Sequence, residues 1–235
     1  MFSQVFLAMT ALEMEEYSPQ RSAYMACHFS SYSRGLSNLP KQMPANSILL
    51  LDDSIPIQDH DPIQVVRQLN ELAEQFSIRA LLLDFQRERD LQTQEMAAAI
   101  LAGVSCPAAV TASYADIMDS PVFLSPVPVN MSLQHYLRPW QGRDVFLELS
   151  CERVQFTITE SGSIQNTLPP GYSNQLPQQE PKLHCHYDTA VFPDKVIFTL
   201  QRTPEDLEAL ADEAYRLGVR GVVGLYQELI NPPKK

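Results

Sequence analysis

Short apolar runs that end in acidic residues are the feature that most constrains the fold of this chain. Ser47–Asp53 reads SILLLDD and Arg79–Gln86 reads RALLLDFQ. Short, unbroken hydrophobic runs are typical of strands buried on both faces of a sheet. Between them, Asp61 and Pro62 form a helix-start signal, followed by apolar residues at helical spacing. The repeating unit is therefore a strand followed by a helix.

This unit recurs along the chain. Strand starts near Ile48, Ala80 and Ala108 lie about thirty residues apart, the length of one strand-helix unit with its crossover. Parallel pairing follows, and the number of candidates favours an α/β fold of the (β/α)₈ barrel type over an open sheet. The candidate strands are Gln4–Met9, Ala23–His28, Ser47–Asp53, Arg79–Gln86, Ala108–Ser113, Pro121–Val127, Val145–Leu149, Lys195–Leu200 and Val219–Leu225.

The second half of the barrel is expected to be irregular. Beyond Tyr114 the connections hold only short helical segments, and a polar, proline-punctuated stretch interrupts the pattern at about 153–182. We expect this stretch to be a hairpin and loop excursion over the barrel mouth. The whole chain, residues 1–235, is then a single α/β barrel domain with that excursion inserted.

Charge and hydropathy restrict the partners of the chain. Its 17 Lys and Arg against 28 Asp and Glu give a net charge of −11, which repels phosphate backbones and anionic lipid. We expect neither nucleic acid nor membrane as a partner. The acidic start, with Glu13, Glu15 and Glu16, does not resemble a signal peptide, and no apolar run has transmembrane length. A cytoplasmic protein is expected, with a homodimer as the default assembly.

No cofactor is predicted. The four cysteines form no CxxC pair, and no glycine cluster resembles GxGxxG or a P-loop. Dinucleotide and Walker-type nucleotide binding therefore have little support, and the cysteines are expected to be buried apolar residues.

Polar residues at the predicted strand ends are the candidate site, because function in such barrels gathers where the carboxyl ends of the strands meet. Carboxylates held near each other there would separate in pKa and could act as acid and base. Aromatic side chains near the rim, including Tyr226, could stack on a sugar. The candidate catalytic residues are Asp84, Gln86 and Glu228, and the candidate substrate-binding residues are His28, Asp53, Tyr114, Glu148 and Tyr226.

The segment RALLLDFQ resembles the strand-end pattern D-G-x-D-x-D-x-E of the chitinase-like glycoside hydrolases of family 18. Asp84 matches the last Asp, and Gln86 stands where the family has its general acid. The resemblance implies that Asp84 orients the N-acetyl group of a sugar substrate, and it places this segment on the fourth barrel strand. An amide cannot donate a proton at neutral pH, so the family chemistry requires Glu88, Glu148 or Glu228 as a substitute. The ligand implied is an oligosaccharide or a related small molecule, bound or processed.

Two other functions stay open. Alternation along a strand would place His184, His186 and Asp188 on one face, as three ligands for zinc in a metal-dependent small-molecule enzyme. An edge strand with one wet face explains the same pattern without a metal. A non-catalytic binding or scaffold protein that kept the fold and lost the site is the third reading, since this architecture hosts many functions.

Overall fold

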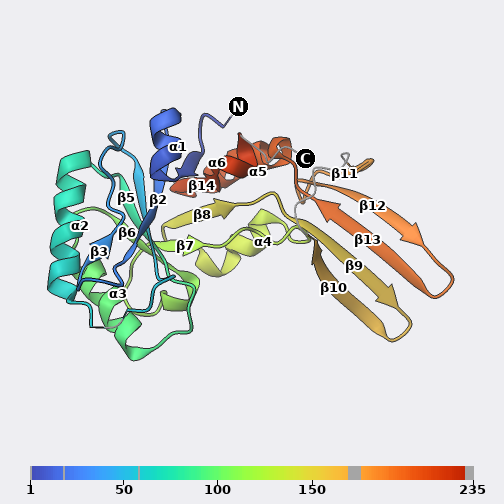
Figure 1. Ribbon diagram of the computed structural model, residues 1–235. Coiled ribbons are helices and arrows are strands. Elements are labelled where there is room, and N and C mark those ends of the chain that lie inside the picture. Colours follow the sequence, from blue (N-terminus) through green and yellow to red (C-terminus); the bar gives the residue numbers. More distant parts are fainter. Residues whose placement is uncertain (1, 18, 58, 169–175, 231–235) are drawn as a thin grey trace.

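The computed structural model describes residues 2–17, 19–57, 59–168 and 176–230. Its main body is a closed barrel of parallel strands (Figure 1). Strand β1 pairs with both β14 and β2, which closes the ring. In order around the barrel, the strands are β1 (Phe6–Met9), β2 (Ser22–Phe29), β4 (Ile48–Asp52), β5 (Ala80–Asp84), β6 (Ala108–Thr111), β7 (Val122–Leu124), β8 (Val145–Leu149) and β14 (Gly221–Leu225). The predicted eight-stranded α/β barrel is confirmed, and β3 (Leu36–Ser37) adds a short antiparallel partner to β2.

Helices cover the outside of the barrel (Figure 1). Asp61 caps α2, where its carboxylate accepts from Ile63 N at 3.0 Å, and Pro62 opens the first turn as predicted. Within the described ranges, no helix is long and apolar enough to cross a membrane. The helical segments are α1 (Ala11–Glu16), α2 (Pro62–Phe76), α3 (Leu91–Gly103), η1 (Ala112–Tyr114), α4 (Leu133–Leu137), η2 (Arg138–Trp140), α5 (Pro204–Arg216) and α6 (Tyr226–Leu229).

The barrel strands are buried on both sides, and alternation decides which residues face inward. On β4, Ile48 and Leu50 belong to the interior cluster of the barrel. The alternate residues, Leu49 and Leu51, pack under the helices. On β5, Ala80 and Leu82 are the interior residues. Because side chains alternate along a strand, the residues two positions further on, which are the carboxylates at the strand ends, also point into the barrel.

A second, antiparallel sheet is inserted between β8 and α5 and extends away from the barrel (Figure 1). It occupies more of the chain than the expected excursion at 153–182. Its strands, in order across the sheet, are β10 (Gly162–Leu168), β9 (Arg153–Thr159), β13 (Lys195–Gln201), β12 (Cys185–Val191) and β11 (Gln178–Glu180).

One strand assignment was wrong. Lys195–Leu200 was expected in the parallel barrel, but β13 pairs antiparallel with β9 and β12. Alternate residues of β13 face one side of the inserted sheet, where they lie beside their register partners on β9. These residues are Val196, Phe198 and Leu200. The apolar run therefore serves a sheet with one apolar face, and the remaining eight candidate strands complete the barrel.

Arg202 fixes the base of the inserted sheet to the barrel. Its side chain is 2% exposed, and its guanidinium donates to the backbone carbonyls of Val127, Pro128 and Leu183. These carbonyls belong to the loop after β7 and to the turn before β12. Because the planar guanidinium has five donors in a rigid fork, one side chain joins the sheet to the loop after β7.

Candidate active site

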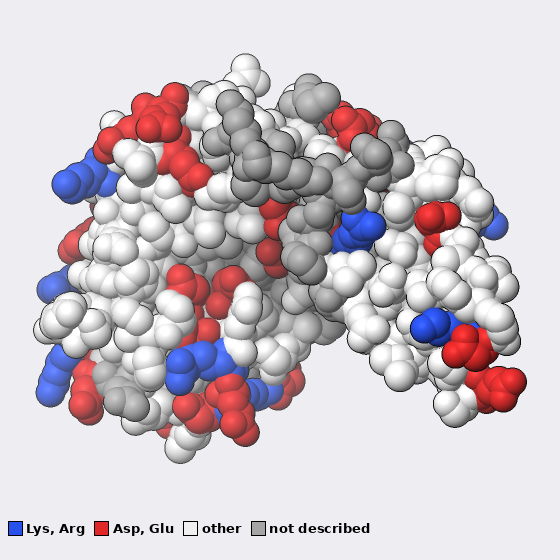
Figure 2. Space-filling view, turned by 45° about the vertical axis from the view of Figure 1, so that its right-hand side comes forward, with Lys and Arg blue, Asp and Glu red and all other residues white. Residues whose placement is uncertain are grey.

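A small cavity lies inside the barrel at the carboxyl ends of its strands. It has a volume of about 110 Å³, and its polar lining consists of Asp52, Asp84 and Glu148. The other residues that line it are apolar or glycine, among them Met25 and Phe123. The cavity can hold a few waters or one small polar substituent of a larger ligand. Figure 2 shows several acidic side chains on the barrel side of the hollow between the barrel and the inserted sheet.

Asp84 ends β5, the fourth barrel strand, where the resemblance to chitinase-like enzymes places it. It is the register partner of Asp52 on β4. Burial raises the pKa of the Asp84 carboxyl, and the charges of Asp52 and Asp53 raise it further, while a hydrogen bond from Gln86 opposes the shift. Desolvation and like charge both disfavour the ionised form.

Gln86 is exposed in the loop after β5, and its Nε2 donates to Asp84 Oδ1 at 2.9 Å. The position that carries the acid in the resembled pattern therefore holds an amide that orients Asp84. Glu88 follows as an exposed residue of the same loop and is absent from the lining of the cavity.

Glu148 enters the cavity from β8, the seventh barrel strand. Its register partner is Val223 of β14, an interior residue of the barrel. Burial is the largest cause that raises the pKa of Glu148 to about 7, and the charges of Asp84 and Glu228 follow. A carboxyl group with such a pKa carries a proton for much of the time at neutral pH, as a general acid must.

Glu228 lies just outside the cavity on α6. Its carboxylate accepts from Cys151 N at 2.7 Å and from Ser150 Oγ at 3.5 Å. It therefore ties the last barrel loop to the segment that leads into the inserted sheet. Tyr226, on the same short helix, stacks in a tilted arrangement on Tyr17 with 5.3 Å between ring centroids.

His28 reaches the inner side of the barrel through an irregularity of β2. Ala23 of β2 faces the interior, but the register with β4 shifts between Tyr24 and Cys27. The shift places Cys27 between the barrel and the helices, paired with Leu51. It makes His28 the register partner of Asp52. His28, Asp52 and Asp84 thus form one row across three adjacent strands.

Of the five predicted binding residues, only Glu148 lines the cavity. Asp53 and Tyr114 have structural contacts elsewhere. Asp53 is 2% exposed, and its carboxylate accepts from Gln86 N at 2.8 Å and from Arg87 N at 3.1 Å. Tyr114 is completely buried beneath the helices and packs edge-on against Phe85. Asp53 therefore holds the loop that carries Gln86, and Tyr114 belongs to the hydrophobic core.

The three residues considered as zinc ligands do not converge. His184 lies in the turn before β12 with a positive φ, so it does not share the strand alternation of its neighbours. Its Nε2 contacts Glu213 Oε2, whereas His186 Nδ1 lies 2.9 Å from Asp206 Oδ2. Asp188 is exposed on β12. Among the described residues, no group of three or more His, Cys, Asp or Glu side chains is arranged to hold a metal ion.

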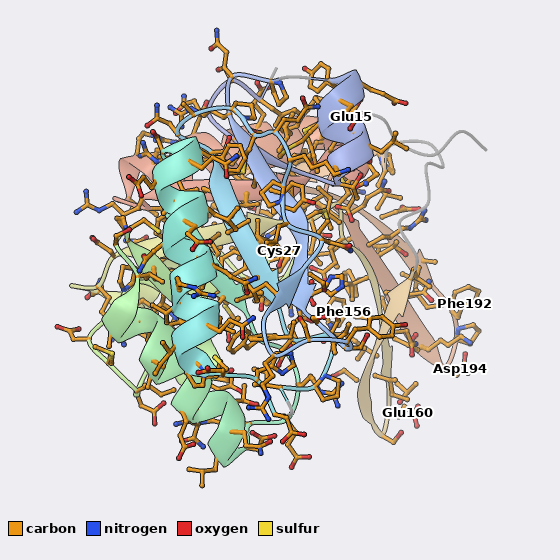
Figure 3. The ribbon with its side chains drawn as sticks, turned by 60° about the vertical axis from the view of Figure 1, so that its left-hand side comes forward. Glu15, Cys27, Phe156, Glu160, Phe192 and Asp194 are labelled. Carbon is orange, nitrogen blue, oxygen red and sulfur yellow. The ribbon has the colours of Figure 1, made fainter. Side chains whose placement is uncertain are left out.

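The inserted sheet presents an apolar groove of about 520 Å³ on one face. Phe156 of β9, labelled in Figure 3, is the register partner of Phe198 on β13, and Tyr187 of β12 pairs with Leu200. The groove also includes Asn130, from the loop after β7. It therefore borders the same end of the barrel as the cavity. Apolar residues alternate in both 154–159 and 196–200, but the apolar face exists only because the two segments pair, which residue types alone do not show.

Comparison with known proteins finds similarity in structure alone. No protein-family model and no curated protein sequence matches the chain. The spore cortex-lytic enzyme SleL of Bacillus cereus matches with a TM-score of 0.52 at 7% identity, over 97% of this chain and 70% of SleL. SleL of Bacillus megaterium QM B1551 matches with a TM-score of 0.51 at 11% identity, over 94% and 70%.

A chitinase from Chromobacterium violaceum ATCC 12472 matches with a TM-score of 0.52 at 10% identity, over 94% of this chain and 93% of the chitinase. Identities this low establish a similarity of fold. The segment RALLLDFQ had suggested the same class of protein, and its end lies on the fourth strand of the barrel. The chain therefore shares its barrel fold with this chitinase and the two spore cortex-lytic enzymes.

Proposed function

We propose that this protein binds an oligosaccharide at the carboxyl end of its barrel. The observation that carries the proposal is the convergence of Asp52, Asp84 and Glu148 in one cavity, in a barrel whose structural neighbours include a chitinase and two cortex-lytic enzymes. Polar groups converging in an otherwise apolar pocket are the usual form of a small-ligand site. Carboxylates and protonated carboxyl groups bond well to sugar hydroxyl and amide groups.

The size of the two depressions suggests how the ligand lies. A cavity of about 110 Å³ accepts one substituent of a sugar. An N-acetyl group is one such substituent, and the family resemblance implies that Asp84 orients it. The groove of about 520 Å³ on the inserted sheet offers the aromatic side chains of Phe156, Tyr187 and Phe198 to the rest of the chain of sugars. Aromatic rings stack on the apolar faces of pyranoses, so the groove and cavity together fit an extended saccharide.

Isothermal titration calorimetry with chito-oligosaccharides and purified peptidoglycan fragments tests the proposal. Wild-type protein should bind one of the two series, and Asp84→Ala should lose that binding while its melting temperature stays near that of the wild type. Asp194→Ala removes a carboxylate at the tip of a hairpin (Figure 3) and should bind normally. Absence of binding to both series, or unchanged binding by Asp84→Ala, would contradict the proposal.

A further inference from the structure

We propose that Glu148 is the proton donor of a glycoside-cleaving reaction in this barrel, taking the role for which Gln86 is chemically unsuited. The inference rests on the proposed saccharide site and adds to it a reaction and a catalytic residue. Its geometric basis is that Glu148 and Asp84 line the same cavity from two separate strands of the ring, β8 and β5, with β7 and β6 between them. A substituent in the cavity would hold its sugar ring at the mouth of the cavity, next to the two carboxyl groups.

The ionisable side chains around Glu148 are all acidic. Asp84 and Asp52 reach the cavity from β5 and β4, Glu228 approaches from α6, and Tyr136 from α4 is close enough for Glu148 to raise the pKa of its phenol. No Lys or Arg lines the cavity within the described residues. With no cation to stabilise its charge, Glu148 keeps its proton to a higher pH than an exposed glutamate does.

The Glu148 carboxyl is also available to a ligand. Within the described part of the chain, no hydrogen bond joins it to another side chain. This distinguishes it from the other two glutamates that could replace the amide. Glu228 is engaged by the backbone of Cys151, and Glu88 is exposed outside the cavity.

The proposed step balances with water as the only co-substrate. The Glu148 O–H gives its proton to the glycosidic oxygen, and the bond from that oxygen to the anomeric carbon breaks, leaving its electron pair on the departing hydroxyl. A water oxygen bonds to the anomeric carbon, and the Asp84 carboxylate takes the proton that this water releases. Proton exchange with solvent then returns Glu148 to the acid form and Asp84 to the carboxylate.

The test compares leaving groups. A dinitrophenyl glycoside departs without protonation, whereas an oligosaccharide requires it, so loss of a general acid affects the two substrates unequally. Glu148→Gln should lower kcat/KM for the oligosaccharide bound by wild type by about 10²–10⁴-fold, and lower it less than tenfold for the dinitrophenyl glycoside of the same sugar. Glu160→Gln, at a hairpin tip (Figure 3), is the matched control and should retain wild-type rates.

Calorimetry on the same samples separates the two proposals. If the wild type binds the oligosaccharide but releases no product, the role of Glu148 as proton donor is overturned and saccharide binding stands. Equal losses by Glu148→Gln on both substrates would indicate a structural role and would also overturn it. If the wild type binds neither series of saccharides, the proposed function itself fails.

Discussion

Asp52 and Asp84 are register partners on the adjacent parallel strands β4 and β5, and both line the cavity inside the barrel. Two like charges at one level of a sheet destabilise each other. Their sequence contexts are nearly identical, ILLLD and ALLLD, so the parallel pairing brings the two acids together. An arrangement that costs stability at the end of a barrel is typical of a functional site.

The acids of the cavity predict an unusual dependence of stability on pH. The pKa of Glu148 is about 7 in the folded protein and near 4.5 for an ordinary glutamate. The folded state therefore holds the proton more tightly, and this group lowers stability as pH rises from about 4.5 to 7. Glu148→Gln should be more stable than wild type at pH 8, by about 2 kcal/mol after solvent screening. Urea unfolding at pH 8 and pH 4 checks this, because the difference should nearly vanish at pH 4.

Replacing Asp53 should lower the free energy of unfolding, because Asp53 holds a loop, whereas Asp52 lines the cavity. Its buried carboxylate accepts from the backbone N–H groups of Gln86 and Arg87. Asp53→Ala leaves both donors without that partner and should lower the free energy of unfolding by about 3 kcal/mol. Asp53→Asn keeps one acceptor and should lose less. Equal stability of Asp53→Ala and wild type in urea titrations would show that the loop after β5 is held by other contacts.

Arg202 should control the attachment of the inserted sheet. Arg202→Met removes the donors to three backbone carbonyls and should cost about 3 kcal/mol. Arg202→Lys should restore little of it, because an ammonium cannot match the planar fork of donors. Hydrogen exchange should increase first in the strands of the inserted sheet. Uniform acceleration over the barrel strands would contradict this assignment.

The apolar groove should contribute to affinity for long ligands. Phe156→Ala removes one ring of the pair formed with Phe198 and should weaken binding of a longer oligosaccharide by about three- to tenfold. Binding of a short oligosaccharide, which fills the barrel end alone, should change little. Phe192→Ala is the control, since that ring lies at the hairpin tip beside Lys195 (Figure 3). A uniform loss for both ligands would indicate that Phe156 supports the fold of the sheet.

The barrel could be predicted from the sequence because each of its strands is a short apolar run with a helix or a turn beside it. The sheet inserted after β8 could not, since Lys195–Leu200 resembles a buried barrel strand in composition. β13 lies beyond the end of the expected excursion, and its pairing with β9 depends on contacts between segments that are distant in sequence. The positive φ of His184 likewise could not be read from residue types, and it removes the alternation on which the zinc hypothesis depended.

The convergence of the acids could be predicted in part. Asp84 and Glu148 line one cavity because acids at the ends of buried parallel strands meet at one rim. Asp52 and Asp53 are adjacent in sequence, and only the burial pattern shows that Asp52 faces the cavity while Asp53 binds the neighbouring loop. Tyr114 follows a strand like the other candidates, but the turn at 112–114 directs it into the core.

A crystal structure of the protein with a bound oligosaccharide tests the central claim most directly. Crystals grown with the chito-oligosaccharide or peptidoglycan fragment that gives the strongest calorimetric signal should show a sugar substituent within hydrogen-bond distance of Asp84 and Glu148. The remaining sugars should extend toward Phe156. A saccharide bound elsewhere, with only solvent between the carboxyl groups of the cavity, would contradict the account.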